Sequence, residues 1–173
     1  MTIRMKIVNT AHVSYRVSDL SKSLEFYEKG LGLKRKFALM NAEAAASFAS
    51  SPEFVDSNPE YQQYAEYLNA HKDDIWLVYL EVAPHQYIEL FPGTAEMPHN
   101  ETTMSQTGYL HLSFEVDDIY KAREELLAKN INVTSEIHLG IEKTYQFWVT
   151  DPDGNPIEFM QYTEDSYQIR GRE

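Results

Sequence analysis

Residues 108–118 read GYLHLSFEVDD and repeat the pattern of residues 11–19, AHVSYRVSD. The two stretches are 99 residues apart (111 − 12), and four of their positions match: His12 with His111, Ser14 with Ser113, Val17 with Val116 and Asp19 with Asp118. Both alternate polar and apolar residues, a period of two that is typical of a strand with two unlike faces. The pattern predicts one unit present twice, each opening with a strand that carries a histidine on its more polar face.

The composition limits the classes of protein to consider. The chain has 173 residues, enough for one domain or for two small halves that share a core, and 43% of them are apolar. Its net charge of −12 disfavours nucleic acid and anionic membrane surfaces as partners, because both require clustered Lys and Arg. The absence of cysteine excludes disulfides, thiolate metal ligands and cysteine nucleophiles.

The apolar residues form no run that would carry the chain into a membrane. The N-terminus, MTIRMKIVNTAHV, lacks the apolar core of a signal peptide. No segment approaches the roughly 18 apolar residues expected of a membrane span. We therefore expect a globular, soluble, cytoplasmic protein.

The first copy is predicted over residues 8–91. Its expected elements are a strand, a helix and three more strands, at 8–17, 20–30, 33–40, 74–82 and 87–91. Residues 41–72 interrupt this order with helix-prone and proline-containing sequence, and we interpret them as an insertion. This insertion either covers the mouth of a pocket or is simply a segment packed on the surface of the protein.

The second copy is predicted over residues 108–162. Residues 92–107 are polar and contain two prolines, which indicates a linker, and residues 163–173 form a polar tail. Between these lie an expected strand, helix and three strands, at 109–116, 119–129, 131–138, 144–150 and 156–162. The sequence DPDGN at 151–155 is a strong turn signal. The whole chain is thus predicted to be one α+β domain made of two modules.

Two glutamates lie inside apolar strands at matched places, Glu89 in YIELF and Glu158 in PIEFM. The distance from histidine to glutamate is 77 residues (89 − 12) in the first copy and 47 (158 − 111) in the second, and the insertion accounts for the difference. A buried carboxylate is costly unless it is paired or bound to a cation. Imidazole and carboxylate together suit zinc, nickel, cobalt, manganese or ferrous iron. The plainer alternative is a half-exposed sheet whose polar face meets water.

The remaining histidines lack such symmetry. His85 lies at a turn, His138 has no counterpart in the first copy, and His71 and His99 have polar surroundings. We expect all four to be surface residues.

The chain resembles the vicinal oxygen chelate superfamily, which includes glyoxalase I, bleomycin-binding proteins and extradiol dioxygenases. The first half carries the resemblance in His12, in VSDL at 17–20, in SLEFY at 23–27 and in LGL at 31–33. The second half carries it in His111, in FEVDD at 114–118 and in DPDGN at 151–155, which leads to Glu158. It covers about residues 8–162 apart from the insertion, and glyoxalase I-type proteins, those related to lactoylglutathione lyase, are the most similar.

The resemblance implies two βαβββ modules whose sheets form an open, curled mixed sheet around a metal site. It implies one divalent transition metal held by His12, Glu89, His111 and Glu158: zinc, nickel or cobalt, with iron or manganese as alternatives. It further implies lyase or isomerase chemistry on a small substrate with vicinal oxygens, in which the metal stabilises an enediolate and Glu158 or Glu89 acts as the base. The alternatives are an iron-dependent extradiol-type dioxygenase and a small-molecule binding or resistance protein.

The resemblance also implies substrate contacts and a homodimer. Arg16 matches an arginine that meets glutathione in glyoxalase I, and Tyr87 and Trp148 are expected beside the substrate. The chain departs from glyoxalase I at FPG, 91–93, and at LGIEK, 139–143, which argues against glutathione recognition. Tyr79, Tyr87, Tyr145 and Trp148 together favour a partly apolar substrate.

Overall fold

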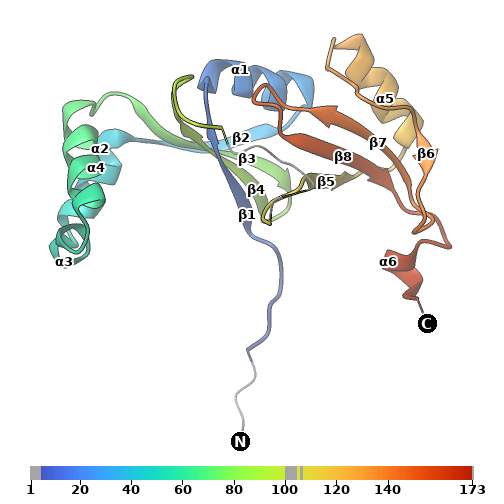
Figure 1. Cartoon of the computed structure of the whole chain (residues 1–173), viewed down its shortest axis with the longest axis horizontal. Helices are drawn as coiled ribbons and strands as arrows, with labels where there is room; N and C mark the ends of the chain where they lie inside the picture. Colours follow the sequence, from blue (N-terminus) through green and yellow to red (C-terminus); the bar gives the residue numbers. More distant parts are fainter. Residues whose placement is uncertain (1–4, 100–104, 106, 173) are drawn as a thin grey trace, which may run out of the picture. The chain divides into compact units, whose positions relative to one another are not determined.

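The computed structural model describes residues 5–99, 105 and 107–172, and they form two compact units (Figure 1). One unit contains the described residues up to Leu20 together with Leu33–Ala95. The other contains Ser21–Gly32 together with the described residues from Glu96 onward. Part of the predicted linker, residues 100–104 and 106, lies outside the described residues.

The first unit is built on a four-stranded mixed sheet in the order β1-β4-β3-β2. Its strands are β1 (His12–Val17), β4 (Gln86–Pro92), β3 (Ile75–Ala83) and β2 (Lys34–Met40). β1 runs parallel to β4, and the other neighbours are antiparallel. Alternation sends one set of side chains into the core: Tyr15, Val17, Val78, Leu80, Ile88 and Leu90. The opposite face is left for polar and aromatic side chains.

Three helices occupy the segment predicted as an insertion, between β2 and β3. They are α2 (Asn41–Ala49), α3 (Pro52–Asp56) and α4 (Pro59–Ala70), and Figure 1 shows them together at one end of those strands. The Asn58 side chain caps α4 by accepting from the Glu60 N–H, with Pro59 at the first helical position. Ala44, Ala45 and Leu68 form a small core of their own, beside partly buried aromatic rings.

The second unit repeats the sheet in the order β5-β8-β7-β6. Its strands are β5 (Leu112–Glu115), β8 (Pro156–Gln161), β7 (Tyr145–Thr150) and β6 (His138–Leu139), and β5 is parallel to β8. α5 (Ile119–Ala128) follows β5, and the Asp118 carboxylate caps it by accepting from the N–H groups of Tyr120 and Lys121. The element order of both copies is therefore βαβββ, and the predicted α+β two-module fold is confirmed.

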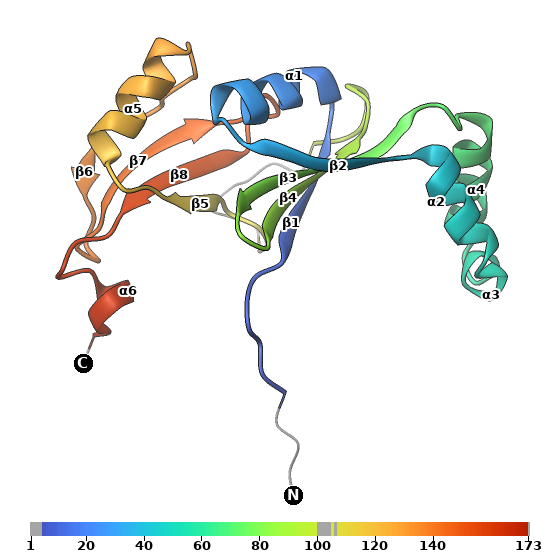
Figure 2. The same cartoon turned by 180° about the vertical axis from the view of Figure 1, so that it is seen from behind.

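The helix between β1 and β2 groups with the second unit (Figure 2). It consists of α1 (Leu20–Leu24) and a π-helical continuation, η1 (Glu25–Gly30), over the range predicted as one helix. Tyr27 is fully buried, and its hydroxyl group donates a hydrogen bond to Asp151 Oδ2 at 3.0 Å. Asp151 also accepts from the backbone N–H groups of Asp153 and Asn155, so the DPDGN turn is anchored to the helix.

The predicted strand over 131–138 is wrong. What remains of it is an isolated bridge between Val133 and Val149 and, at its end, His138, the first of the two residues of β6. The Ser135 hydroxyl accepts from the Trp148 N–H, and the Asn132 amide donates to the Thr150 hydroxyl. The Ser135 hydroxyl thus takes the place of a backbone carbonyl as the acceptor, which is how serine side chains compete with regular ladders.

Smaller differences lie at the ends of elements. The first strand of each copy starts later than predicted, so that His12 is the first residue of β1 and His111 immediately precedes β5. The C-terminal tail contains a short helix, α6 (Tyr167–Arg170). None of the helices in the described part of the chain has the length and apolar content needed to span a membrane.

Candidate metal centre

His12 and Glu89 face each other on the polar side of the first sheet. The parallel register pairs Ser14 with Glu89, which places the carboxylate within reach of the histidine two residues earlier on β1. His12 Nε2 lies 3.8 Å from Glu89 Oε2. The His12 side chain is 43% exposed and that of Glu89 only 11%, so a reachable imidazole stands over a nearly buried carboxylate.

Two hydroxyl groups hold the Glu89 carboxylate. Ser14 Oγ donates a hydrogen bond to Glu89 Oε2, and the Tyr79 side chain also hydrogen-bonds to Glu89. Burial, and then the hydrogen bond and negative charge of Glu89, raise the pKa of Tyr79 to about 12. Tyr79 is therefore a neutral donor near neutral pH.

Aromatic rings surround this first pair. The His12 ring meets Tyr79 edge-on at 5.8 Å between centroids, and Tyr79 stacks on Phe37 at 4.5 Å. The ring centroids of Tyr87 and Tyr79 are 5.6 Å apart. The side of the sheet that carries His12 is thus an aromatic surface around one carboxylate.

His111 and Glu158 form the matching pair in the second unit. The register pairs Ser113 with Glu158, as Ser14 pairs with Glu89, and His111 again lies two residues before that serine. His111 Nε2 lies 3.5 Å from Glu158 Oε2, with side chains 36% and 8% exposed. The Trp148 ring stands edge-on to His111 at 4.8 Å. Each unit therefore brings together the one histidine and the one glutamate predicted from its own copy.

The donor set of each pair fits a divalent transition metal. An imidazole nitrogen and a carboxylate oxygen are ligands that zinc, nickel, cobalt, iron and manganese accept. Each pair consists of two such residues, and no group of three or more His, Asp or Glu side chains that could hold a metal ion occurs among the residues that the structure describes. The structure thus shows two His–Glu pairs, each within its own unit.

The predicted substrate-binding residues lie in different surroundings. Tyr87 contacts Tyr79, and Trp148 contacts His111, so both adjoin a His–Glu pair. Arg16 lies further along β1, where its Nη1 donates to the Pro92 carbonyl at 3.1 Å and its guanidinium sits over the Phe91 ring at 5.7 Å.

Tyr145 was grouped with Tyr79, Tyr87 and Trp148 as an aromatic set near the predicted pocket, but it lies on the other side of its strand from Trp148. Alternation along β7 sets Tyr145 on the side of the buried residue Phe147, opposite to Trp148. Its ring contacts Tyr120 of α5, at 6.3 Å. The four histidines predicted as surface residues, His71, His85, His99 and His138, are all exposed.

Two side chains that support the glutamates are not assigned such a role by the sequence pattern. The repeat marks Ser14 only as a matched position, and it does not single out Gln146, which contacts Glu158. Both share strand parity with a residue of the predicted site, Ser14 with His12 and Gln146 with Trp148. Lying on the same face of the strand is the only feature of the sequence that could have pointed to them. It applies to every second residue of a strand, so it does not identify a hydrogen-bond partner.

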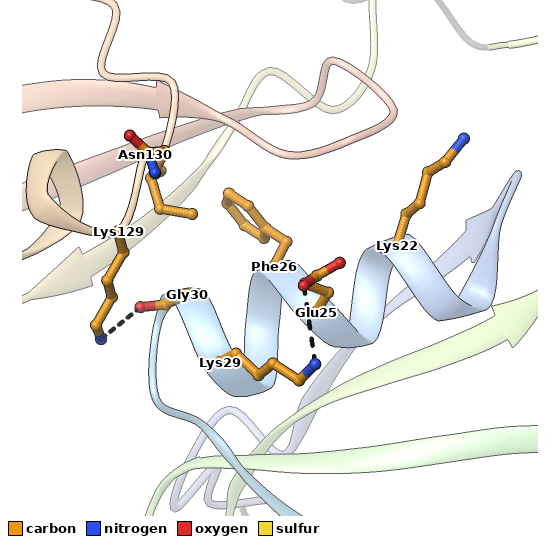
Figure 3. A pocket seen from close by; sticks show the side chains of 8 residues that line it. Lys22, Glu25, Phe26, Lys29, Gly30, Lys129 and Asn130 are labelled. Carbon is orange, nitrogen blue, oxygen red and sulfur yellow. Dashed lines mark hydrogen bonds and ion pairs between the residues drawn. The ribbon is translucent and has the colours of Figure 1, made fainter.

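A separate cavity of about 480 Å³ lies in the second unit, between η1 and the end of α5 (Figure 3). Lys22, Lys29, Lys129 and Phe26 are among its lining residues, which include none of the predicted metal ligands. Lys129 donates to the Gly30 carbonyl at 2.8 Å, and Lys29 pairs with Glu25 at 3.8 Å. The contact from Lys129 satisfies a carbonyl at the helix end.

Known proteins share this sequence pattern and fold. A lactoylglutathione lyase of Pseudomonas putida is 25% identical over 164 residues, which cover 88% of this chain and 84% of that protein. A lactoylglutathione lyase of Haemophilus influenzae is 30% identical over 153 residues, which cover 87% and 90%. The crystal structure of a glyoxalase family protein from Enterococcus faecalis has a TM-score of 0.61 at 20% identity, covering 88% of this chain and 96% of that one. A model of the Glyoxalase/Bleomycin resistance protein/Dioxygenase superfamily matches residues 9–159, and the chain belongs to this superfamily.

Proposed function

We propose that this protein is a metal-dependent lyase or isomerase of the glyoxalase type, acting on a small substrate with vicinal oxygens. The observation that carries the proposal is the duplicated His–Glu contact, 3.8 Å in one unit and 3.5 Å in the other. A nearly buried carboxylate is unfavourable without a cation or a full set of donors. Its presence twice, each time beside an exposed imidazole, favours a metal-binding role for both pairs.

The proposed ligands are His12, Glu89, His111 and Glu158, and the proposed metal is zinc, nickel or cobalt, with iron and manganese as alternatives. Bound by these residues, the metal would supply Lewis-acid polarisation of a substrate oxygen. The two histidines can act as neutral nitrogen ligands, and the two glutamates add the negative charge that a divalent cation requires.

The chain itself would supply the proton transfer. We assign Glu89 and Glu158 as the carboxylates that remove a proton from one substrate carbon and return a proton to its neighbour. Each has one oxygen, Oε2, turned toward its histidine. Each is also held by side chains of its own unit, which keeps it in one orientation and favours transfer to a positioned substrate.

The surroundings of the pairs indicate the kind of substrate. Phe37 is 42% exposed and stacks on Tyr79, and Tyr87 and Trp148 add further rings beside the pairs. Such rings favour a substrate with an apolar or planar part next to its oxygens. We propose Arg16 as the contact for an anionic part of the substrate, since its guanidinium is held over Phe91.

Deuterium exchange in heavy water, followed by proton NMR, tests this function across a panel of possible substrates. The purified protein is loaded with each candidate metal and given hydroxycarbonyl and dicarbonyl compounds, with the lactoylglutathione lyase reaction included because relatives carry that name. We expect metal-dependent exchange at a carbon next to a carbonyl, and its loss in Glu158→Gln or Glu89→Gln. Oxygen consumption with iron and no exchange would contradict the proposal and favour a dioxygenase.

A further inference from the structure

Gln146 lies on the same side of the second sheet as Glu158. The register of β7 and β8 pairs Trp148 with Glu158 and Gln146 with Met160. Residues two apart on a strand face the same way, and diagonal neighbours on adjacent strands are within reach of long side chains. Gln146 and Glu158 are such diagonal neighbours.

Three hydrogen bonds fix the Gln146 amide. In the amide orientation that turns the nitrogen toward the two carboxylates, it donates to Glu158 Oε1 at 3.0 Å and to Glu142 Oε1 at 2.8 Å. Its oxygen accepts from His138 Nε2 at 3.0 Å. The opposite orientation would set a carbonyl oxygen against two carboxylates, so the network itself selects the donor orientation.

The bond from Gln146 differentiates the two oxygens of Glu158. Oε1 is the acceptor for Gln146, whereas Oε2 faces His111 at 3.5 Å. A carboxylate held at one oxygen cannot rotate freely about its last torsion. The amide therefore keeps the other oxygen directed to the histidine with which it would share a cation.

Gly140 makes room for this network. A Cβ at Gly140 would lie 2.6 Å from Glu142 Oε1 and 2.9 Å from the Gln146 amide, closer than such atoms approach. The Gly140 N–H donates to the Thr144 carbonyl, which closes the loop and brings Glu142 back over the glycine. The loop at 139–143 thus carries a carboxylate to the far side of Gln146.

The first unit holds its glutamate differently. Leu77 occupies the position equivalent to Gln146, since it precedes Tyr79 by two residues as Gln146 precedes Trp148, and Tyr79 pairs with Glu89. There, Ser14 and Tyr79 hydrogen-bond to Glu89. A leucine therefore occupies this strand position in the first unit, and the amide of Gln146 is a feature of the second unit.

We propose that Gln146 is a positioning residue for Glu158, which holds one carboxylate oxygen so that the other is presented to a metal together with His111. Hydrogen bonds to Glu142 and from His138 hold the rest of the Gln146 amide in place. This inference rests on the proposed metal-binding role of Glu158. Partners of this kind, behind a metal ligand, typically affect metal affinity by about 10- to 100-fold.

The test is the zinc affinity of Gln146→Leu, measured by competition with a coloured chelator. We expect zinc binding about 10- to 100-fold weaker than in the wild type. The matched control is Gln62→Leu, on the exposed side of α4, which should leave the affinity unchanged. Thermal unfolding in excess chelator separates positioning from folding, because a positioning role predicts nearly equal melting temperatures without metal.

A second comparison shows whether Gln146 acts through Glu158. In the Glu158→Gln background, Gln146→Leu should change zinc affinity by less than about twofold, because coupled residues are non-additive. The visible spectrum of bound cobalt should change in Gln146→Leu and not in Gln62→Leu. Should the leucine variant fail to fold, zinc affinity is measured for Gln146→Met, which removes the amide with little change in shape. The positioning role predicts weaker zinc binding for that variant too.

The outcomes separate this inference from the function on which it rests. Wild-type protein that binds no transition metal overturns both. Wild type that binds zinc, with Gln146→Leu or Gln146→Met binding it equally well, overturns the positioning role alone. A loss of affinity that persists undiminished in the Glu158→Gln background also overturns it.

Discussion

The two units place the same pair of side chains in the same register and then support it with different neighbours. In the first unit, hydroxyl groups of Ser14 and Tyr79 hold the glutamate inside an aromatic surface. In the second, an amide holds it, and Trp148 stands beside the histidine. The duplicated βαβββ frame thus determines where the imidazole and the carboxylate lie, whereas the facing residues of neighbouring strands determine which groups hydrogen-bond to the carboxylate.

The largest expected effect comes from removing the shared feature of the two units. Glu89→Gln and Glu158→Gln each replace a charged carboxylate, proposed as a metal ligand, with a neutral amide of the same shape. We expect each to weaken zinc binding by more than the roughly 100-fold that an outer partner can cost. Chelator competition measures it, and an equal loss from both variants would support a shared metal. If only one variant loses affinity, the two pairs do not act as equivalents.

An intermediate effect should separate the two serines that stand at matched positions. Ser14 donates to Glu89, whereas the described part of the chain shows no hydrogen bond from Ser113 to Glu158. Ser14→Ala should therefore weaken zinc binding by about 10-fold, the lower end for an outer partner, and Ser113→Ala should have little effect. Equal effects of the two substitutions would show that the units are supported alike, contrary to the structure.

The smallest expected effect is a loss of stability at alkaline pH, and it comes from Tyr79 in the first unit. The pKa of Tyr79 is raised from 10.0 to about 12, so the folded protein keeps this proton over a pH range in which the unfolded chain has lost it. Its contribution to stability is present below about pH 10 and is lost as the pH rises through about 12. The free energy of unfolding of the wild type should consequently fall faster than that of Tyr79→Phe in this range. Parallel curves from urea titrations would contradict the shift.

The sequence alone predicts the framework of the candidate site well, for a physical reason. A period of two separates the core side of a strand from the other side, so alternation is enough to assign His12 and Glu89 to one face. The repeat then places His111 and Glu158 in the same way. The two sheets share this register, because each glutamate pairs with the serine two residues after a histidine.

Three features could not be predicted, because they depend on contacts between distant residues. The helix before β2 groups with the second unit, where Tyr27 meets Asp151, 124 residues away. In place of the expected strand before His138, the Asn132 amide donates to the Thr150 hydroxyl and the Ser135 hydroxyl accepts from the Trp148 N–H. The Gln146 network depends on a glycine that lets two polar side chains pack closely. Local propensity contains none of this information.

The most direct test of the central claim is elemental analysis of untagged protein purified without chelator, beside the His111→Ala variant. If His12, Glu89, His111 and Glu158 together hold one ion, as proposed, the wild type contains about one equivalent of transition metal per chain and the variant has lost it. Nickel, zinc or cobalt would favour lyase or isomerase chemistry, and iron would favour an oxygenase. Wild-type protein that carries no metal and takes up none on reconstitution would contradict the account.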